Sequence, residues 1–398
     1  MAIDNKDKKV LKSSIEREQN EVACSAECEK IKGSKNLNVP HLRFPEFQEE
    51  WKKCKLGDLC NVLMCKRILA SQTNTEDGVP FYKIGTIGST PDAYISKELF
   101  DDYKVKYSYP HKGEVMITCA GTVGKCVVYD GEDAYFQDSN IVWIDNPTQN
   151  ISNGFLFHLL SKVDWRKLNS TTIIRIYNDD LRNLKMSYPQ KEEQQKISHL
   201  LSLLDERITT QNKIIERYES LIRGIAQKIA RNNKPNVLLA ECLKCSSSTL
   251  QESDVCESGT YPVYGANGII GYLDGYSTED EAVHIIKDGS GVGTVYYVTG
   301  KCSATGTLNT LQAKDGYLLQ YLYYMLKVFN FEPYKTGMAI PHIYFKDYGK
   351  TKIFCPSYTE QLKYVGVLSA IDNKLSVELS ILTNLSLQKQ YLLRQMFI

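Results

Sequence analysis

Apolar residues recur at alternating steps of three and four along a long stretch of chain that begins after Pro189. The positions of this series are Leu201, Leu204, Ile208, Gln211, Ile215, Tyr218, Ile222, Ile225 and Ile229. Such spacing is typical of the a/d seam of a coiled-coil helix, here with one polar interruption at Gln211. A single apolar seam cannot bury itself, so the pattern predicts a partner helix.

The partner lies in the same chain, at an offset of 167 residues, where Pro356 takes the place of Pro189. Its seam comprises Leu368, Ile371, Leu375, Glu378, Leu382, Leu385, Lys389, Leu392 and Met396. As Gln211 interrupts the first seam, Glu378 interrupts the second at the equivalent position. We therefore expect two long helices of the same phase, produced by an internal repeat.

The segments that precede the two helices are also similar to each other. VMITCAGTVGKCVVY (115–129) and VHIIKDGSGVGTVYYV (283–298) share a glycine turn that ends in Val-Gly, between β-prone runs. STTIIRIYNDD (170–180) aligns in the same way with GMAIPHIYFKD (337–347). Short apolar runs bounded by Gly or Pro predict strands, and GFLFHLLSKV and LLQYLYYMLKV each predict a short helix. The expected fold class is α/β (α+β), with a globular domain followed by a long helix, twice.

Changes of composition set the expected domain boundaries. They are a polar N-terminal arm at 1–38, a first domain at 39–188, a central spacer helix at 189–232, a second domain at 233–355 and a C-terminal spacer helix at 356–398. Two helices of equal phase favour an antiparallel coiled coil with a pseudo-two-fold axis. A seam from Leu201 to Ile229 would be roughly 42 Å long at about 1.5 Å per residue. That length is near the ~34–36 Å of one DNA turn, although length alone does not identify DNA as the ligand.

Composition and charge place the chain among ordinary globular proteins, with 42% hydrophobic residues, 24% charged residues and a net charge of +1. No apolar stretch reaches the ~18–20 residues of a membrane span, and the lysine-rich N-terminus is unlike a signal sequence. We therefore expect a cytoplasmic protein with no membrane partner, whose scattered cysteines stay reduced. Both globular segments have slightly more acidic than basic residues. A strongly electrostatic, independent DNA binder would be more basic.

Candidate catalytic and metal motifs are weak. Cys242 and Cys245 have zinc-ligand spacing and Cys256 follows, but a closed structural site needs four ligands and no second pair occurs. We interpret these residues as free thiols and expect neither a metal nor a cofactor. The glycine turns do not continue as GKS/T and lie between strands, so we expect hairpins rather than phosphate-binding loops. The absence of a nuclease constellation and of an Asn-Pro-Pro-Tyr methyltransferase motif favours a non-catalytic protein.

Several stretches carry a resemblance to a known family. They are LRFPEFQEEWKKCKLGDL (42–59), YPVYGANGIIGYLDGY (261–276), IPHIYFKDYGKTKIFCPSYTEQ (340–361), and the doubled helix entry YPQKEEQQKI and CPSYTEQLKY. In this order, over about residues 39–398, the chain resembles the specificity (S) subunit of type I restriction–modification systems. The N-terminal arm lies outside the resemblance.

The resemblance implies a division of labour between subunits. Each globular part would be a target recognition domain that reads one half of a bipartite, asymmetric site in double-stranded DNA. The helices would space the domains and dock two methyltransferase (M) subunits, and two restriction (R) subunits would complete the complex. The S subunit would perform no chemistry, while the complex would be a DNA adenine methyltransferase and ATP-dependent endonuclease. The alternatives are a coiled-coil scaffold whose domains bind protein or glycan, and a stand-alone nuclease.

Candidate DNA contacts come from the loop before each long helix and from the glycine turns, because Arg, Lys, Asn and Thr can contact phosphates and base edges. In the first domain they are Lys125, Lys167, Asn169, Thr171, Thr172 and Arg175. In the second they are Lys287, Lys335, Thr336, His342, Tyr344 and Lys346. For each residue the alternative is a solvated loop or strand edge. The expected helix–helix core comprises Leu201, Leu204, Ile208, Ile215, Ile222, Leu368, Ile371, Leu375, Leu382 and Leu392.

Overall fold

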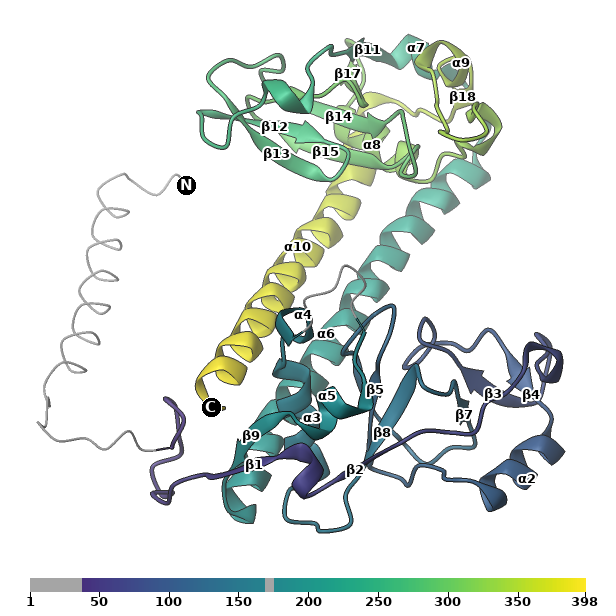
Figure 1. The fold of residues 1–398 in the computed structure, drawn as a ribbon. Helices are drawn as coiled ribbons and strands as arrows, with labels where there is room; N and C mark the ends of the chain where they lie inside the picture. Colours follow the sequence, from purple (N-terminus) through teal and green to yellow (C-terminus); the bar gives the residue numbers. More distant parts are fainter. Residues whose placement is uncertain (1–37, 169–174) are drawn as a thin grey trace, which may run out of the picture. The chain divides into compact units, whose positions relative to one another are not determined.

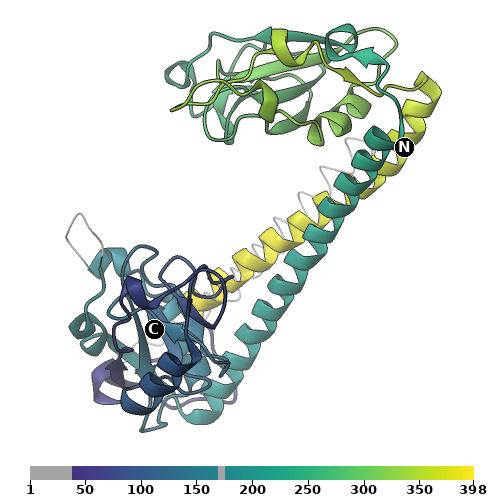
Figure 2. The same ribbon diagram turned by 90° about the vertical axis from the view of Figure 1, so that its right-hand side faces the viewer.

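The structure, a computed structural model, describes residues 38–168 and 175–398 (Figures 1 and 2). The chain divides into two compact units. The first unit runs up to Leu203 and includes Gln388–Ile398, and the second unit is Leu204–Leu387. Each unit holds one globular domain and part of both long helices.

The first domain is built on three small sheets. Its strands are β1 (Lys52–Lys55), β2 (Asn61–Leu63), β3 (Val79–Tyr82), β4 (Tyr94–Ile95), β5 (Val115–Thr118), β6 (Cys126–Val128), β7 (Tyr135–Phe136), β8 (Ile141–Asp145) and β9 (Lys185–Tyr188). Its helices are α2 (Lys97–Lys106), α3 (Asn153–Lys162), α4 (Trp165–Leu168) and α5 (Asn178–Arg182), with 3-10 turns η1 (Leu56–Asp58) and η2 (Ala70–Gln72). The sheet orders are β2-β8-β5-β6, β4-β3-β7 and β1-β9. All pairs are antiparallel except β3 with β7.

The second domain repeats this plan. Its strands are β10 (Val237–Leu238), β11 (Leu243–Ser247), β12 (Tyr261–Gly265), β13 (Gly268–Leu273), β14 (Glu281–Ile286), β15 (Val295–Thr299), β16 (Ser303–Ala304), β17 (Leu308–Ala313) and β18 (Lys352–Ile353). Its helices are α7 (Leu239–Cys242), α8 (Leu319–Lys327) and α9 (Phe345–Tyr348), with 3-10 turns η3 (Glu252–Asp254) and η4 (Glu332–Tyr334). The orders β11-β17-β14-β15, β13-β12-β16 and β10-β18 match the first domain strand for strand, including the parallel pair β12 with β16. The predicted fold class, with its internal repeat, is confirmed.

Each four-stranded sheet is covered by an equivalent helix. α3 packs on β5 and β6, as α8 packs on β14 and β15. In the first domain the other face of the sheet packs against the three-stranded sheet through Met116, Trp143 and Phe81. Because β5 and β14 are covered on both faces, their sequences are nearly continuous apolar runs rather than alternating ones.

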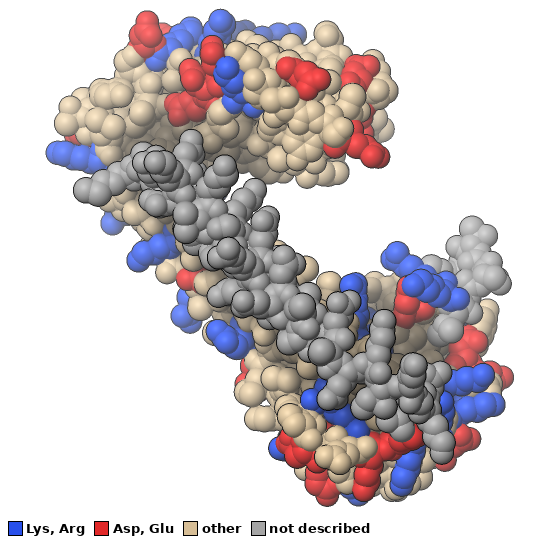
Figure 3. Space-filling view, turned by 90° about the vertical axis from the view of Figure 1, so that its left-hand side faces the viewer, with Lys and Arg blue, Asp and Glu red and all other residues tan. Residues whose placement is uncertain are grey.

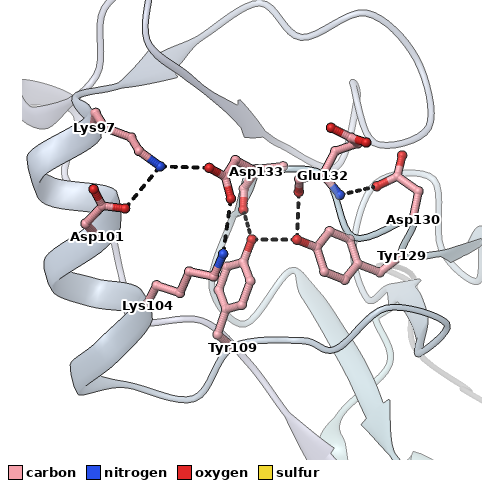
Figure 4. A network of polar contacts seen from close by, with 9 residues as sticks. Lys97, Asp101, Lys104, Tyr109, Tyr129, Asp130, Glu132 and Asp133 are labelled. Carbon is pink, nitrogen blue, oxygen red and sulfur yellow. Dashed lines mark hydrogen bonds and ion pairs between the residues drawn. The ribbon is translucent and has the colours of Figure 1, made fainter.

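Helix α2 distinguishes the first domain, because the shorter β13–β14 connection of the second domain contains no helix. Two of its lysines hold Asp133, with Nζ–Oδ distances of 2.7 Å from Lys97 and 3.1 Å from Lys104 (Figure 4). These ammonium groups lower the pKa of the Asp133 carboxyl. Beside them the Tyr109 hydroxyl lies 2.8 Å from that of Tyr129. The charge of these lysines therefore fixes the helix to the β6–β7 connection.

The long helices are α6 (Lys191–Asn232) and α10 (Tyr358–Gln395). Within the second unit they lie side by side and antiparallel (Figures 1 and 2). The Gln211 side-chain amide donates hydrogen bonds to the Glu378 carboxylate at 2.5 Å and to the Glu378 carbonyl at 3.0 Å. The two polar interruptions of the repeated seams therefore meet each other, and the local pseudo-two-fold axis of the helix pair passes between them.

Most seam positions are covered. In the second unit the buried members are Leu204, Gln211, Ile215, Ile222, Ile229, Leu368, Leu375 and Leu385, and the half-buried members are Ile208, Tyr218, Ile225, Ile371, Glu378 and Leu382. In the first unit Leu201 and Met396 are buried, and Lys389 and Leu392 are half-buried. The charged and polar residues between these positions are mostly exposed, as expected for an amphipathic helix pair.

A buried glutamine joins each domain to the start of its long helix. The Gln194 oxygen accepts from the Ser152 backbone N–H at 2.7 Å, and the Gln361 oxygen accepts from the Leu318 N–H at 2.9 Å. Each amide nitrogen donates to the carbonyl of the proline before the helix, at 2.8 and 3.0 Å. Both glutamines are almost fully buried. This contact accounts for the repeated Pro-x-x-x-Glu-Gln sequence.

The adjacent glutamate has different roles in the two units. Glu193 is buried and accepts two hydrogen bonds of 2.7 Å from the Arg43 guanidinium and one of 3.3 Å from the Trp51 indole N–H. Glu360 is exposed and accepts from the Ser357 hydroxyl at 2.8 Å. In the first unit the stretch around Arg43 also holds the end of α10, because the Leu42 N–H donates to the carbonyl of Gln395, the last helical residue, at 2.9 Å.

The Val-Gly that closes the glycine turn in both domains has a steric explanation. Gly124 and Gly293 have φ values of +83° and +91°, a region that L side chains rarely adopt. A Cβ on Gly124 would lie 2.2 Å from Cδ1 of Trp165, and a Cβ on Gly293 would lie 3.2 Å from Cβ of Phe331. An aromatic ring thus packs directly on the turn in both domains.

Replacing Gln211 with Leu should lower the free energy of unfolding by ~1–3 kcal/mol, because the half-buried Glu378 carboxylate loses its donor. The double variant Gln211→Leu/Glu378→Leu should recover most of this loss, since two leucines continue the apolar seam. Denaturant unfolding followed by circular dichroism measures both effects, with the exposed Asn212→Leu as control. Wild-type stability for Gln211→Leu alone would show that the hydrogen bond does not stabilise the helix pair.

Gly124→Ala should destabilise the first domain more than Gly113→Ala does. Both glycines have positive φ values, +83° and +90°, but a Cβ at Gly113 has its nearest neighbour at 3.9 Å. Gly113→Ala therefore measures only the cost of placing an alanine at a positive φ. The clash with Trp165 should lower the free energy of unfolding of Gly124→Ala by a further ~1–3 kcal/mol. Thermal unfolding of the two variants gives the difference. Equal losses would mean that the Trp165 ring can move aside freely.

Candidate nucleic-acid interface

A small hairpin precedes the last long helix in the second domain. The Thr336 N–H donates to the His342 carbonyl at 2.9 Å, and the His342 N–H donates to the Thr336 carbonyl at 2.7 Å. Gly337 opens the turn with a φ of +90°, and a Cβ there would lie 2.3 Å from the Ile340 carbonyl oxygen. We name this element hairpin 336–342. Its conformation depends on a glycine at its second position.

Hairpin 336–342 is held against the glycine turn between β14 and β15. The Gly289 N–H donates to the Pro341 carbonyl at 3.0 Å, and the Ile343 N–H donates to the Lys287 carbonyl at 2.9 Å. The His342 ring Nδ1 lies 2.6 Å from Oδ1 of Asp288. The Phe331 ring packs on this glycine turn. The hairpin is therefore attached to a well-packed part of the domain.

The structure gathers the candidate residues of the second domain around this hairpin. Thr336 and His342 pair within it, and Lys287 supports it through its carbonyl. On the following turn the Lys346 ammonium lies 5.2 Å from the ring centroid of the exposed Tyr344. Lys335 differs, because its ammonium lies 2.6 Å from the Glu332 carboxylate. Five of the six residues therefore lie in or beside the hairpin, and the ammonium of the sixth, Lys335, is paired with Glu332.

Sequence reasoning missed three residues of this arrangement. Asp288 orients the His342 ring, and Met338 and Ile340 form the exposed tip of hairpin 336–342. Asp288 could have been found from its place in the glycine turn. The two apolar residues gave no chemical signal, because an isolated Met or Ile in a sequence usually indicates core.

The corresponding part of the first domain is described only in part. Asn169, Thr171 and Thr172 lie outside the described residues. After them the Ile176 N–H donates to the Cys119 carbonyl at 2.9 Å, which repeats the bond between Ile343 and Lys287. The chain next to the glycine turn is thus anchored in the same way in both domains.

Arg175 takes the place of His342 in the first domain. Its guanidinium donates to the Ser139 carbonyl at 3.4 Å and lies 5.9 Å from the ring centroid of Tyr177. Tyr177 is exposed and occupies the repeat position of Tyr344, a correspondence that the 167-residue offset could have revealed. An exposed tyrosine beside a cation is thus common to both domains.

The other two basic candidates of the first domain are directed elsewhere. The Lys125 ammonium donates to the Ile87 carbonyl at 2.5 Å, so this side chain is held along its own domain. Lys167 is highly exposed, and its ammonium lies 3.5 Å from the Asp164 carboxylate. On the face drawn in Figure 3, basic and acidic side chains are interspersed within each unit. Binding to a polyanion would therefore depend on a few individual Lys or Arg side chains rather than on a broad basic surface.

The cysteines of the CxxC motif are not activated thiols. Burial raises the pKa of Cys242 to about 12 and that of Cys245 to about 11, so both remain protonated at neutral pH. Among the residues that the structure describes, no group of three or more His, Cys, Asp or Glu side chains could hold a metal ion. The same described residues include no helix both long and apolar enough to cross a bilayer.

Comparison with known proteins agrees with the duplicated architecture. The family described as "Type I restriction modification DNA specificity domain" matches residues 48–219 and 239–385. A type I restriction enzyme specificity subunit of Haemophilus influenzae is 50% identical over 165 residues, which cover 42% of each chain. The EcoprrI specificity subunit of Escherichia coli is 28% identical over 116 residues, 29% of each chain. The matched regions thus span less than half the length of these two relatives.

A solved structure shows the same fold. The type I restriction-modification S subunit from M. genitalium superposes with a TM-score of 0.61 and 18% sequence identity, covering 90% of this chain and 99% of that one. The two matched segments of the family coincide with the two copies of the repeated domain and the helices that follow them. With most of its length matched, the chain belongs to the family of type I restriction–modification DNA specificity proteins and carries two copies of the specificity domain.

Proposed function

We propose that this chain is the DNA sequence-recognition subunit of a type I restriction–modification complex. Each domain would read one half of a bipartite, asymmetric site. The observation that supports this most directly is the duplication itself: two domains of the same topology, each joined by a buried glutamine to one helix of an antiparallel pair. The domain boundaries proposed for this role are 39–188, 189–232, 233–355 and 356–398, after an arm at 1–38.

DNA contact, to phosphates or to base edges, is proposed for the chain around each glycine turn. In the second domain the contacts would come from Lys287, Lys335, Thr336, His342, Tyr344 and Lys346, and in the first from Lys125, Lys167, Asn169, Thr171, Thr172 and Arg175. Hairpin 336–342 supports this proposal because a two-stranded β-ribbon fits the major groove of B-DNA. Its rigid attachment also lowers the entropy lost on binding.

Partner subunits follow from the same proposal. Two M subunits would dock on the outer faces of α6 and α10, and two R subunits would complete the complex. Since both domains carry nearly balanced charge, the M subunits would supply much of the phosphate contact. The chain itself would be non-catalytic, while the complex would methylate adenine and cleave DNA with ATP. Such a complex acts on DNA in the cytoplasm.

The test is a selection from random DNA. The chain is mixed with M subunits, retained DNA is sequenced, and a bipartite consensus with a fixed gap is expected. His342→Ala should relax the consensus in one half only, and Arg175→Ala in the other half only, because each residue belongs to one domain. Ile269→Thr, an exposed position on β13, is the control for the second domain.

Other outcomes would contradict the proposal. A continuous consensus without a gap, or changes in both halves from a single variant, would argue against one domain per half-site. Absence of any enriched sequence would favour a scaffold whose domains bind protein or glycan. Cleavage of DNA by the purified chain with Mg²⁺ alone would indicate a nuclease.

A further inference from the structure

The tip of hairpin 336–342 is apolar and fully open to solvent. Met338 has 107% of its reference exposed area and Ile340 has 58%. Neither side chain belongs to a hydrophobic cluster of the second domain. Exposing this much apolar surface gains nothing for folding, since the hydrophobic effect favours its removal from water. Exposed apolar surface of this kind marks a contact site.

The tip is also held in one place. Its two ends pair through the Thr336 and His342 backbones, and its base is fixed by Pro341 to the glycine turn. The His342 ring contacts Asp288, and Gly337 sets the direction of the turn. A rigid element that presents apolar side chains loses little entropy when it binds. The backbone hydrogen bonds at its base distinguish this tip from a loop that is not held by the rest of the domain.

The surroundings of the tip are polar and partly cationic. Thr336 and His342 flank it in sequence, and Lys287 lies at its base. Tyr344 precedes α9, and Lys346 lies on that helix. A target that satisfies this pattern has an apolar group at its centre and anionic groups around it. In the major groove of DNA the only apolar group on the base edges is the 5-methyl of thymine, and phosphates line both sides of the groove.

We propose, on the basis of the function proposed above, that Met338 and Ile340 read the 5-methyl group of thymine in the half-site bound by the second domain. The contact is apolar and therefore distinguishes thymine from cytosine and from uracil. Loss of one buried methyl group should weaken binding about three- to fivefold. The effect is local, because the tip reaches one or two base pairs while the cations contact the backbone.

Thymine-to-uracil replacement tests the proposal, because it removes the methyl group and leaves the base pair intact. The chain with its M subunits is first used to select the preferred site. Each thymine of the second half-site is then replaced by deoxyuridine, one at a time, and the dissociation constant is measured. One or two positions should weaken binding by wild-type protein about three- to fivefold. Met338→Ser or Ile340→Thr should bind thymine and uracil DNA equally at those positions.

Matched controls distinguish loss of the methyl contact from loss of folding and from a general loss of DNA binding. Ile269→Thr changes an exposed isoleucine of the same domain and should keep the wild-type discrimination. Uracil in the first half-site should affect wild type and Met338→Ser alike. Circular dichroism should show that all variants are folded, because Met338 and Ile340 are exposed and neither belongs to a hydrophobic cluster of the second domain.

Several results would overturn the inference. A selected half-site without thymine would do so, as would uracil effects that persist in both tip variants. Equal weakening of thymine and uracil DNA by Met338→Ser would indicate a wedge or a general contact instead. In these cases a bipartite consensus still supports the proposed function. Failure to select any sequence would remove the proposed function and this inference with it.

Discussion

The hydrogen bond between Gln211 and Glu378 sets the register of the helix pair. These residues are equivalent in the internal repeat, so their contact makes the helix pair locally symmetric in the second unit. A shift by one heptad would place Glu378 against Leu204 or Tyr218, and its half-buried carboxylate would lose the donor that Gln211 supplies. Polar residues at a single a or d position are known to select one register of a coiled coil in this way.

Each long helix is fixed at its start to the domain that precedes it. Gln194 and Gln361 provide this link, because each amide bonds both to its domain and to the proline at the start of its helix. The first unit adds a buried ion pair between Arg43 and Glu193. The second unit has no counterpart among its described residues, since its glutamate, Glu360, is exposed and accepts from the Ser357 hydroxyl. The two connections between domain and helix therefore share the glutamine hydrogen bonds, but only the first includes an ion pair among the described residues.

Within each domain the scaffold is repeated and the variable chemistry is confined to its edge. The same strand orders, the same aromatic ring on the glycine turn and the same backbone bond to that turn occur twice. Arg175 replaces His342 at the first position after the loop, and helix α2 occurs in the first domain only. Loops tolerate such change because they contribute little to the core. Two domains of one fold thus present different side chains at the same edge.

The sequence by itself determined the repeat, both long helices, the polar positions at the centre of their seams and the strand-rich character of the domains. These features are periodic or local, so spacing and side-chain type are enough to reveal them. Only the tertiary structure decided that Gln211 contacts Glu378, that Gln194 bonds to Ser152, and that Lys125 is tied to Ile87 while Met338 stands in solvent. Such contacts join residues far apart in the chain, and whether a lysine or methionine is buried depends on what the fold brings beside it. Apolar residues at a hairpin tip therefore resemble core residues until the surrounding chain is in place.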